Sequence, residues 1–341
     1  MAELGDPGDA QSAGDPVIAP RRRRRWPRVL LSLGLAVVLV AGAASIGVGA
    51  LLKRLEGNVT TIQGLETATE ESQSYEALNF LVMGSDSREG DNSSFGDAGD
   101  IGGQRSDTTI LVHLAADRQS ALAVSIPRDT YVTMPKCASQ SGDWEVSGKF
   151  NSAFTFGGPA CTTKTVKRIT GLPIHHVVVV DFTGFEQVVD AMGGVDICLE
   201  EATVDPLSNL DLPAGWSTVD GEQALAFVRT RSALGDGSDI SRIQRQQEFM
   251  AAAIQQGTDR SLLANPVKLY SILDAATSSL SVDKGLNELS EMTELANSVR
   301  SLSPADISFV TMPFVYANDG SNVLINERRA AEIWDAMAAD Q

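Results

Sequence analysis

The stretch HHVVVVDFTGFEQVVDAMGGVDICL, residues 175–199, decides the fold class. His175 to Val180 is a β-branched run that predicts a buried strand, and the amphipathic segment after it predicts a helix closed by glycines. Val195 to Leu199 then returns to a strand pattern. A strand, a helix and a strand in this order predict an α/β layer with a crossover connection.

Other strands are predicted on the N-terminal side of this stretch. The apolar run Leu78 to Met83 ends at a glycine, as a buried strand would. Thr108 to Ala115 and Ala121 to Ile126 come next, and the turn-like Asp117-Arg118-Gln119 between them favours a hairpin.

Helices and a last strand account for the rest of the pattern. The predicted helices are Lys149 to Phe156, Thr162 to Thr170, Gly221 to Val228, Asp239 to Gln256, Pro266 to Ser279, Gly285 to Ser301 and NERRAAEIWDAMAA at 326–339, and the strand is DISFVTMPF at 306–314. We therefore predict a single α/β/α domain over residues 78–320, with a central mixed β-sheet flanked by helices. A C-terminal helix within residues 321–341 packs on it.

The N-terminal part predicts a membrane anchor. Arg21 to Arg25 precede the uncharged run Val29 to Leu52, which as a helix would reach about 36 Å and could cross a bilayer. The positive-inside rule keeps the basic flank in the cytoplasm and exports the residues after the run. We expect a disordered basic tail over 1–28, a transmembrane helix over 29–52 and a stalk over 53–77. A signal peptide cleaved at Ala-Gly-Ala, residues 41–43, is the alternative.

Charge argues against a generic nucleic-acid binder. Residues 1–53 hold seven of the 27 basic and four of the 44 acidic side chains, which leaves 20 basic against 40 acidic in the exported part. Nucleic-acid binding needs a basic face, so we expect no nucleic-acid partner.

All three cysteines lie in the part predicted to be exported, where disulfides persist. Cys137 and Cys161 bracket a polar loop, and we predict that they pair. Cys198 is left over in VDICL, where we expect a buried thiol acting as a small hydrophobe.

The basic residues of the exported part crowd into four short motifs. GSDSREG, GGQRSDTT and SIPRD lie at predicted strand ends, where α/β sheets place their sites. The fourth runs from VRTR to SRIQRQQ, in which Arg242 and Gln246 share a helix face. Several guanidinium groups in one place repel unless an anion lies between them, and phosphate oxygens fit their geometry. The arginines are Arg88, Arg105, Arg128, Arg229, Arg231, Arg242 and Arg245.

Carboxylates alternate with these arginines. Asp86, Asp107 and Asp129 each lie within two residues of one of them. A diphosphate with Mg²⁺ would satisfy both signs, because Mg²⁺ takes one or two carboxylates together with phosphate oxygens. The alternative is a set of ordinary salt bridges at loop ends.

The motifs resemble those of a known family. NFLVMGSDSREG, GGQRSDTTILVHL, AVSIPRDTYV, KFNSAFTFGG, GGVDICL, GEQALAFVRTR and DISRIQRQQ occur in the same order as in the LytR-CpsA-Psr family of cell-wall ligases. The resemblance runs from about Leu78 to Gln256 and is looser beyond. One departure is the polar insertion between Arg88 and Arg105, residues 89–104, whose role the sequence leaves open.

The resemblance implies a phosphotransferase. It would move a glycopolymer with its linking phosphate from a polyprenyl-pyrophosphate carrier to a peptidoglycan acceptor, at the outer face of the cell membrane. Its Mg²⁺, or Mn²⁺, would be held by two carboxylates, Asp86 and Asp107. The implied diphosphate-binding residues are Arg105, Arg128, Arg229, Arg231, Arg242 and Gln246, with Arg88 contacting the same group.

Several alternatives stay open at this point. The general base is Asp86, Asp107 or Asp129. The same pocket could serve a pyrophosphatase that releases the lipid without an acceptor, or a sensor that binds lipid or glycan without turnover. Transcriptional regulation fits poorly, because the motifs lie outside the predicted membrane and no helix-turn-helix pattern precedes it. The identity of the polymer is not encoded in any of these motifs.

Overall fold

The structure is a computed structural model of the whole chain. The residues that it describes are 49–65, 76–85, 106–137, 145–230, 234, 239–259, 262, 264–299, 302–318 and 321–341. The predicted tail and most of the predicted span lie outside these ranges, and residues 49–52 are helical. Within the ranges, no helix has the length and apolar character needed to cross a bilayer. Residues 52–341 form one structural unit.

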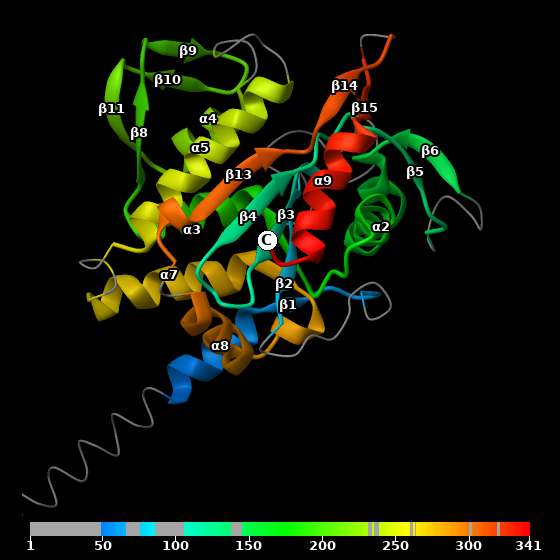
Figure 1. The fold of residues 1–341 in the computed structure, drawn as a ribbon. Coiled ribbons are helices and arrows are strands. Elements are labelled where there is room, and N and C mark those ends of the chain that lie inside the picture. Colours follow the sequence, from blue (N-terminus) through cyan, green and yellow to red (C-terminus); the bar gives the residue numbers. More distant parts are fainter. Residues whose placement is uncertain are drawn as a thin grey trace, which may run out of the picture. The chain divides into compact units, whose positions relative to one another are not determined.

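A mixed seven-stranded sheet lies at the centre of this unit (Figure 1). The predicted hairpin is confirmed: β3 (Ser106–Leu114) and β4 (Ala121–Ser125) pair antiparallel with Leu114 opposite Ala121. β2 pairs antiparallel with β3 and parallel with β7, and β13 pairs parallel with β4. In spatial order the strands are β1 (Thr60–Thr61), β12 (Leu280–Val282), β7 (His176–Asp181), β2 (Leu78–Ser85), β3 (Ser106–Leu114), β4 (Ala121–Ser125) and β13 (Ile307–Thr311).

The helices predicted over 221–228, 239–256, 266–279 and 326–339 are confirmed to within one residue at each end, whereas only 289–299 of the helix predicted over Gly285 to Ser301 is α-helical. Asn265, whose side chain accepts hydrogen bonds from two helix N–H groups, caps α7 one residue before Pro266. Asp220 forms a capping box with Gln223 at the start of α4. The helices are α2 (Ser152–Thr170), α3 (Phe182–Met192), α4 (Gly221–Arg229), α5 (Asp239–Gly257), α7 (Pro266–Ser279), α8 (Leu289–Val299) and α9 (Glu327–Ala338), with single turns η2 (Lys284–Leu286) and η3 (Pro304–Asp306).

Both faces of the central sheet are buried, which confirms the predicted α/β fold with a mixed sheet between helices. Alternate residues along each strand face opposite sides. On one face, Leu81 and Leu111 belong to a core with α2 and α9, which contributes Trp334. On the other face, Phe80 and its neighbours pack against α8. A third cluster joins α3, α4 and α5 to the short strands beside them.

The crossover expected from residues 175–199 is wrong in its last step. β8 (Val195–Leu199) does not return to the central sheet but pairs antiparallel with β11 (Gly215–Val219) in a two-stranded sheet. Cys198 is exposed on β8, opposite Trp216, so the expectation of a buried thiol is also wrong. The other small sheets are β5 (Tyr131–Met134) with β6 (Val146–Lys149), β9 (Thr203–Asp205) with β10 (Leu210–Leu212), and β14 (Phe314–Tyr316) with β15 (Val323–Ile325).

A kink divides α2 at the glycines that the sequence pattern places between two helices. Gly157 and Gly158 have non-helical backbone angles, and Pro159 comes directly after them. Cys137 and Cys161 form a disulfide there, with their Cα atoms 5.4 Å apart. A Cβ at Gly157 would lie 2.8 Å from the Cβ of Cys161, so the disulfide needs a glycine at this position.

Part of the stretch predicted to be a stalk belongs to the fold. β1 pairs with β12 at the edge of the central sheet. Leu55 and Leu65 are buried, and the Asn58 amide donates to Asp274 on α7. Residues 53–65 are therefore anchored to the domain by hydrogen bonds and apolar packing.

Candidate functional site

One edge of the central sheet gathers the predicted chemistry. The last residue of β2, Ser85, pairs with the first residue of β3, Ser106, and with the end of β7. The last residue of β4, Ser125, pairs with Thr311 at the end of β13. Asp107 and Arg128 lie close to these ends in the chain, so the strand-end placement expected from the sequence is confirmed for this pair.

Arg128 lies at the centre of an ion-pair cluster. Its Nη1 donates to Oδ1 of Asp107 at 2.7 Å, and its Nε lies 3.1 Å from Oδ1 of Asp239 and 3.7 Å from Oδ2 of Asp129. Burial acts to lower the pKa of Arg128, but Asp239, Asp107 and Asp129 outweigh it and raise the pKa above its ordinary value. Arg128 is therefore a fixed cation in a pocket of carboxylates.

Arg242, on the first turn of α5, joins the same cluster. Its Nη2 lies 2.6 Å from Oδ1 of Asp239 and 3.5 Å from the main-chain oxygen of Asp107. The residue is only 3% exposed. Arg128 and Arg242, which are 114 positions apart in the sequence, thus contact the same carboxylate.

Asp239 is the residue that the sequence did not single out for this site. The sequence pattern marks Asp239 only as the first residue of a predicted helix, and α5 does begin there, but its carboxylate also bridges two arginines. The spacing of three residues between Asp239 and Arg242, which places both on one helix face, was the available signal.

Arg245, on the same helix as Arg242, binds main-chain oxygens. It is 6% exposed, and its guanidinium donates to the main-chain oxygens of Leu234 at 2.8 Å and of Thr230. The Thr230 hydroxyl in turn donates to Asp205, which is also buried. These bonds anchor the main chain at Thr230 and at Leu234.

Arg229 ends α4 and lies beside an aromatic ring. Its guanidinium lies 4.6 Å from the ring centre of Phe182 on α3. Burial, with Glu222 and Asp190, raises the pKa of the nearby Glu186, and Arg229 opposes this. Gln246 donates to the main-chain oxygen of Val228 at 3.4 Å and so contacts the same helix end.

Four predicted site residues lie outside the described ranges. They are Asp86, Arg88, Arg105 and Arg231, and the insertion over residues 89–104 lies outside as well. Their roles stay predictions.

The donor set around Arg128 fits a Mg²⁺ ion that completes its coordination with substrate oxygens. Such an ion needs one or two carboxylates, together with waters and phosphate oxygens. Asp107 supplies one carboxylate, and Oδ2 of Asp239 is buried and accepts no hydrogen bond from the described residues. No group of three or more His, Cys, Asp or Glu residues suited to a metal occurs in those residues. Substrate would have to complete the site.

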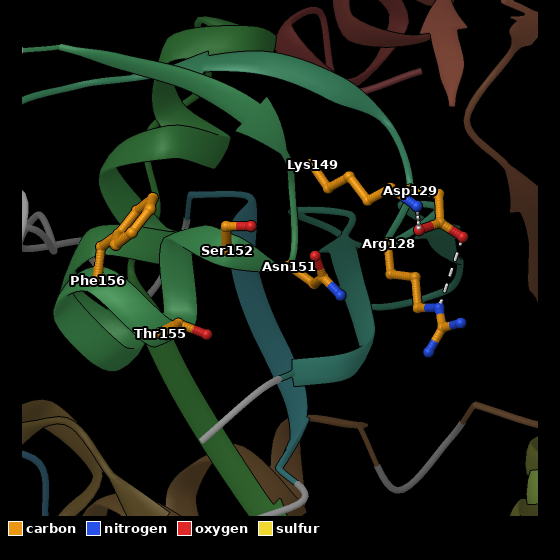
Figure 2. Close-up of a pocket in the computed structure, with 7 residues that line it drawn as sticks. All are labelled: Arg128, Asp129, Lys149, Asn151, Ser152, Thr155 and Phe156. Carbon is orange, nitrogen blue, oxygen red and sulfur yellow. Dashed lines mark hydrogen bonds and ion pairs between the residues drawn. The ribbon is translucent and has the colours of Figure 1, made fainter. Parts of the chain in front are cut away.

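A cleft of about 300 Å³ opens beside Arg128 and Asp129 (Figure 2). Lys149, the last residue of β6, reaches into it and donates to Oδ1 of Asp129 at 2.7 Å. The sequence pattern predicts that a short helix begins at Lys149, which is wrong, because Lys149 ends a strand. Nothing in the sequence indicates the contact between Lys149 and Asp129. The remaining lining residues are Asn151, Ser152, Thr155 and Phe156.

Comparison with known proteins agrees with this architecture. The LytR_cpsA_psr family model matches residues 53–339. The chain is 37% identical over 261 residues to a protein from Corynebacterium glutamicum named "Probable cell wall biosynthesis protein LcpB", a match that covers 75% of this chain and 57% of the relative. It is 30% identical over 302 residues to the Bacillus subtilis polyisoprenyl-teichoic acid–peptidoglycan teichoic acid transferase TagT, covering 84% and 87%.

A solved structure supports the fold. The LytR-Csp2A-Psr enzyme from Actinomyces oris matches with a TM-score of 0.60 at 21% identity, over 79% of this chain and 92% of the other. At 21% identity the structural similarity supports the fold alone. The chain spans less than two thirds of the length of the corynebacterial relative.

Proposed function

The chain belongs to the LytR_cpsA_psr family, and from that premise we propose that it transfers a phospho-linked glycopolymer from a polyprenyl-diphosphate carrier to peptidoglycan. The name of the Bacillus subtilis relative states a reaction of this kind for that protein. The polymer transferred by this chain is left unspecified, since a diphosphate common to many carriers is what the cluster would bind.

One observation carries the proposal: Arg128 and Arg242 converge on the carboxylate of Asp239. Two guanidinium groups this close together repel each other unless negative charge lies between them. Asp239 provides that charge in this structure. A diphosphate supplies more negative charge and planar arrays of oxygens that match the guanidinium fork. We propose that its oxygens bind to this pair, with Arg105, Arg229, Arg231 and Gln246 completing the cradle.

The reaction is a displacement at the phosphorus that bears the glycan. A hydroxyl oxygen of the acceptor forms the new P–O bond, and the bond to the oxygen bridging the two phosphorus atoms breaks. Polyprenyl phosphate leaves with that electron pair, and the hydroxyl proton passes to a carboxylate. Asp129 is the base that we favour, because its carboxylate lies at the boundary between the arginine cluster and the cleft. Arg128 and Arg242 stabilise the charge that develops on the phosphate oxygens.

A divalent cation, Mg²⁺ or Mn²⁺, would be held by Asp107 and Asp86. When bound, it neutralises charge on the diphosphate and polarises its oxygens. Arg128 would hold Asp107 in place through the 2.7 Å hydrogen bond.

The site would work at the outer surface of the cell membrane, on a carrier whose lipid stays in the bilayer. Supporting this are the arginines at 21–25, the uncharged run over 29–52 and the disulfide between Cys137 and Cys161. Protease protection of the full chain in membrane vesicles of known orientation tests it: the domain should be digested when the outer face is exposed.

The transfer is tested by incubating the full-length chain with a polyprenyl-diphosphate-linked glycan, Mg²⁺ and peptidoglycan. We expect glycan phosphate on the peptidoglycan, with the product lost in EDTA and restored by Mg²⁺. Arg128→Ala should slow transfer about 10²- to 10³-fold, as for other single contacts to transition-state charge. Arg168→Ala, which removes an exposed arginine paired with Glu145, is the matched control and should keep full activity.

Two results would contradict the proposal. Glycan phosphate released into solution without any conjugate would indicate a pyrophosphatase. Lipid binding without turnover under any acceptor would indicate a sensor.

A further inference from the structure

The cleft beside the arginine cluster has a composition unlike that of the cluster itself. Arg128, Asp129 and Lys149 lie at one end of it and Phe156 at the other, with Asn151, Ser152 and Thr155 between them (Figure 2). Charge is thus confined to the end that adjoins the phosphate-binding residues. The rest is a row of neutral polar groups that ends in an aromatic ring.

Such a row matches the chemistry of a sugar. Hydroxyl and amide groups both donate and accept hydrogen bonds, as sugar hydroxyls do, and an aromatic face packs on the C–H face of a pyranose ring. Asn151 stands at the N-cap of α2, yet its side chain makes no capping hydrogen bond. Capping of α2 therefore does not require the Asn151 amide. In the cleft the same amide can form a hydrogen bond with a sugar hydroxyl.

The segment that carries these side chains is fixed at three points. The Asn151 N–H donates to the main-chain oxygen of Arg128 at 3.1 Å, and the Phe150 N–H donates to that of Thr130 at 2.8 Å. Directly after Phe156, the disulfide between Cys137 and Cys161 fixes the kink of α2. A wall fixed to the Arg128 segment itself keeps a constant position relative to the reacting phosphorus, which is what an acceptor subsite requires.

We propose that this cleft is the acceptor subsite, which binds a peptidoglycan sugar and directs its hydroxyl to Asp129. The inference rests on the proposed transfer reaction and adds where the acceptor binds. Asp129 contacts Arg128 on one side and Lys149 on the other, so one carboxylate faces both the phosphate-binding cluster and the cleft. A hydroxyl presented from the cleft would approach the phosphorus from the side of Asp129, and in-line displacement would place the leaving group on the opposite side.

Isosteric removal of cleft hydroxyls tests the subsite. Ser152→Ala and Thr155→Val, singly and together, keep the shape of the wall and remove hydrogen-bonding groups. We expect the KM for a soluble peptidoglycan acceptor to rise about three- to tenfold for each hydrogen bond lost. The KM for the lipid-linked donor should stay unchanged. Thr133→Val, the same change on β5 where the hydroxyl contacts Ser147 outside the cleft, is the control and should alter neither KM.

The outcomes separate the two possible sugars. A raised donor KM with an unchanged acceptor KM would assign the cleft to the donor glycan and overturn the proposal. Unchanged constants for both would show that the cleft holds no substrate.

A binding measurement does not depend on turnover. Saturation-transfer NMR with a soluble disaccharide-peptide from peptidoglycan should show contact with the full-length chain and a loss of signal in the double variant. Equal signals in wild type and double variant would overturn the subsite. Binding with this dependence but no transfer would instead count against the proposed reaction.

Discussion

Asp239 is the residue on which the geometry of the site depends most, so its loss gives the sharpest prediction. Its Oδ1 lies 2.6 Å from Arg242 and 3.1 Å from Arg128, and the side chains of the three are 18%, 4% and 17% exposed. At an effective dielectric constant of about 20, a unit pair at 2.6 Å attracts by roughly 6 kcal/mol. Desolvation of each ion costs several kcal/mol, so the net stabilisation by the pair is much smaller than this attraction.

Removing one partner leaves the other charge buried, which is why Asp239→Asn should be costly. Breaking such a pair typically lowers the free energy of unfolding by about 3 to 5 kcal/mol. We expect the lower end, about 3 kcal/mol, because Arg128 retains Asp107 and Asp129. Arg242→Gln should cost a similar amount.

A double-mutant cycle by urea denaturation of the full chain isolates the interaction. Asp239→Asn, Arg242→Gln and the double variant should give a coupling energy of about 2 kcal/mol. The exposed pair of Glu145 and Arg168 serves as the control cycle and should give a far smaller coupling. A coupling for Asp239 and Arg242 below about 0.5 kcal/mol would show that the carboxylate does not hold the two arginines together.

Other parts of the fold give three further predictions. Gly157→Ala should lower the free energy of unfolding by about 1 to 3 kcal/mol, because the new methyl group would lie 2.8 Å from the Cβ of Cys161. Thermal denaturation tests this against Gly148→Ala, whose Cβ would lie at an ordinary 3.5 Å from Met134, and equal stability of the two variants would count against it. Glu186→Gln should raise the melting temperature at neutral pH: burial and the neighbouring carboxylates raise the pKa of Glu186, so the folded state favours the protonated form and loses stability as pH rises through that pKa. The gain should shrink as the pH falls below about 4, where the wild-type carboxyl becomes protonated in both states, and a gain independent of pH would exclude this cause. Arg245→Lys should lower the transfer rate, although Arg245 is not proposed to contact substrate, because lysine cannot reproduce the two donations that hold the main chain at Thr230 and Leu234. Hydrogen exchange at Thr230 and Leu234 should rise in parallel, and unchanged exchange would contradict the prediction.

Elements with a strong local signal were predictable from the sequence. The hairpin of β3 and β4, the capped helix α7 and the kink of α2 each depend on residues that lie close together in the chain. The partner of β8 was not predictable, because the pattern of a five-residue strand shows its buried face but not the strand it pairs with. The pairing of β1 with β12 was not predictable either, because strands of two and three residues are too short to show a hydrophobic pattern.

The candidate site divides in the same way. Arg128, Arg242 and Asp107 were found because arginines and carboxylates crowd into short motifs at strand ends. Asp239 was missed because an aspartate at a helix start is usually a cap, and its contact with Arg128 is 111 residues distant in sequence. Lys149 was missed because a lone lysine carries no spacing signal, and only the β5–β6 hairpin brings it to Asp129.

Binding of a lipid carrier's diphosphate by Arg128 and Arg242 can be measured without turnover. Calorimetric titration of the full-length chain with a short-chain polyprenyl diphosphate and Mg²⁺ should give an affinity that falls at least about tenfold in Arg128→Ala and in Arg242→Ala. Arg168→Ala should bind like wild type. Wild-type affinity in both cluster variants would show that the diphosphate binds elsewhere and that these arginines are not its binding site.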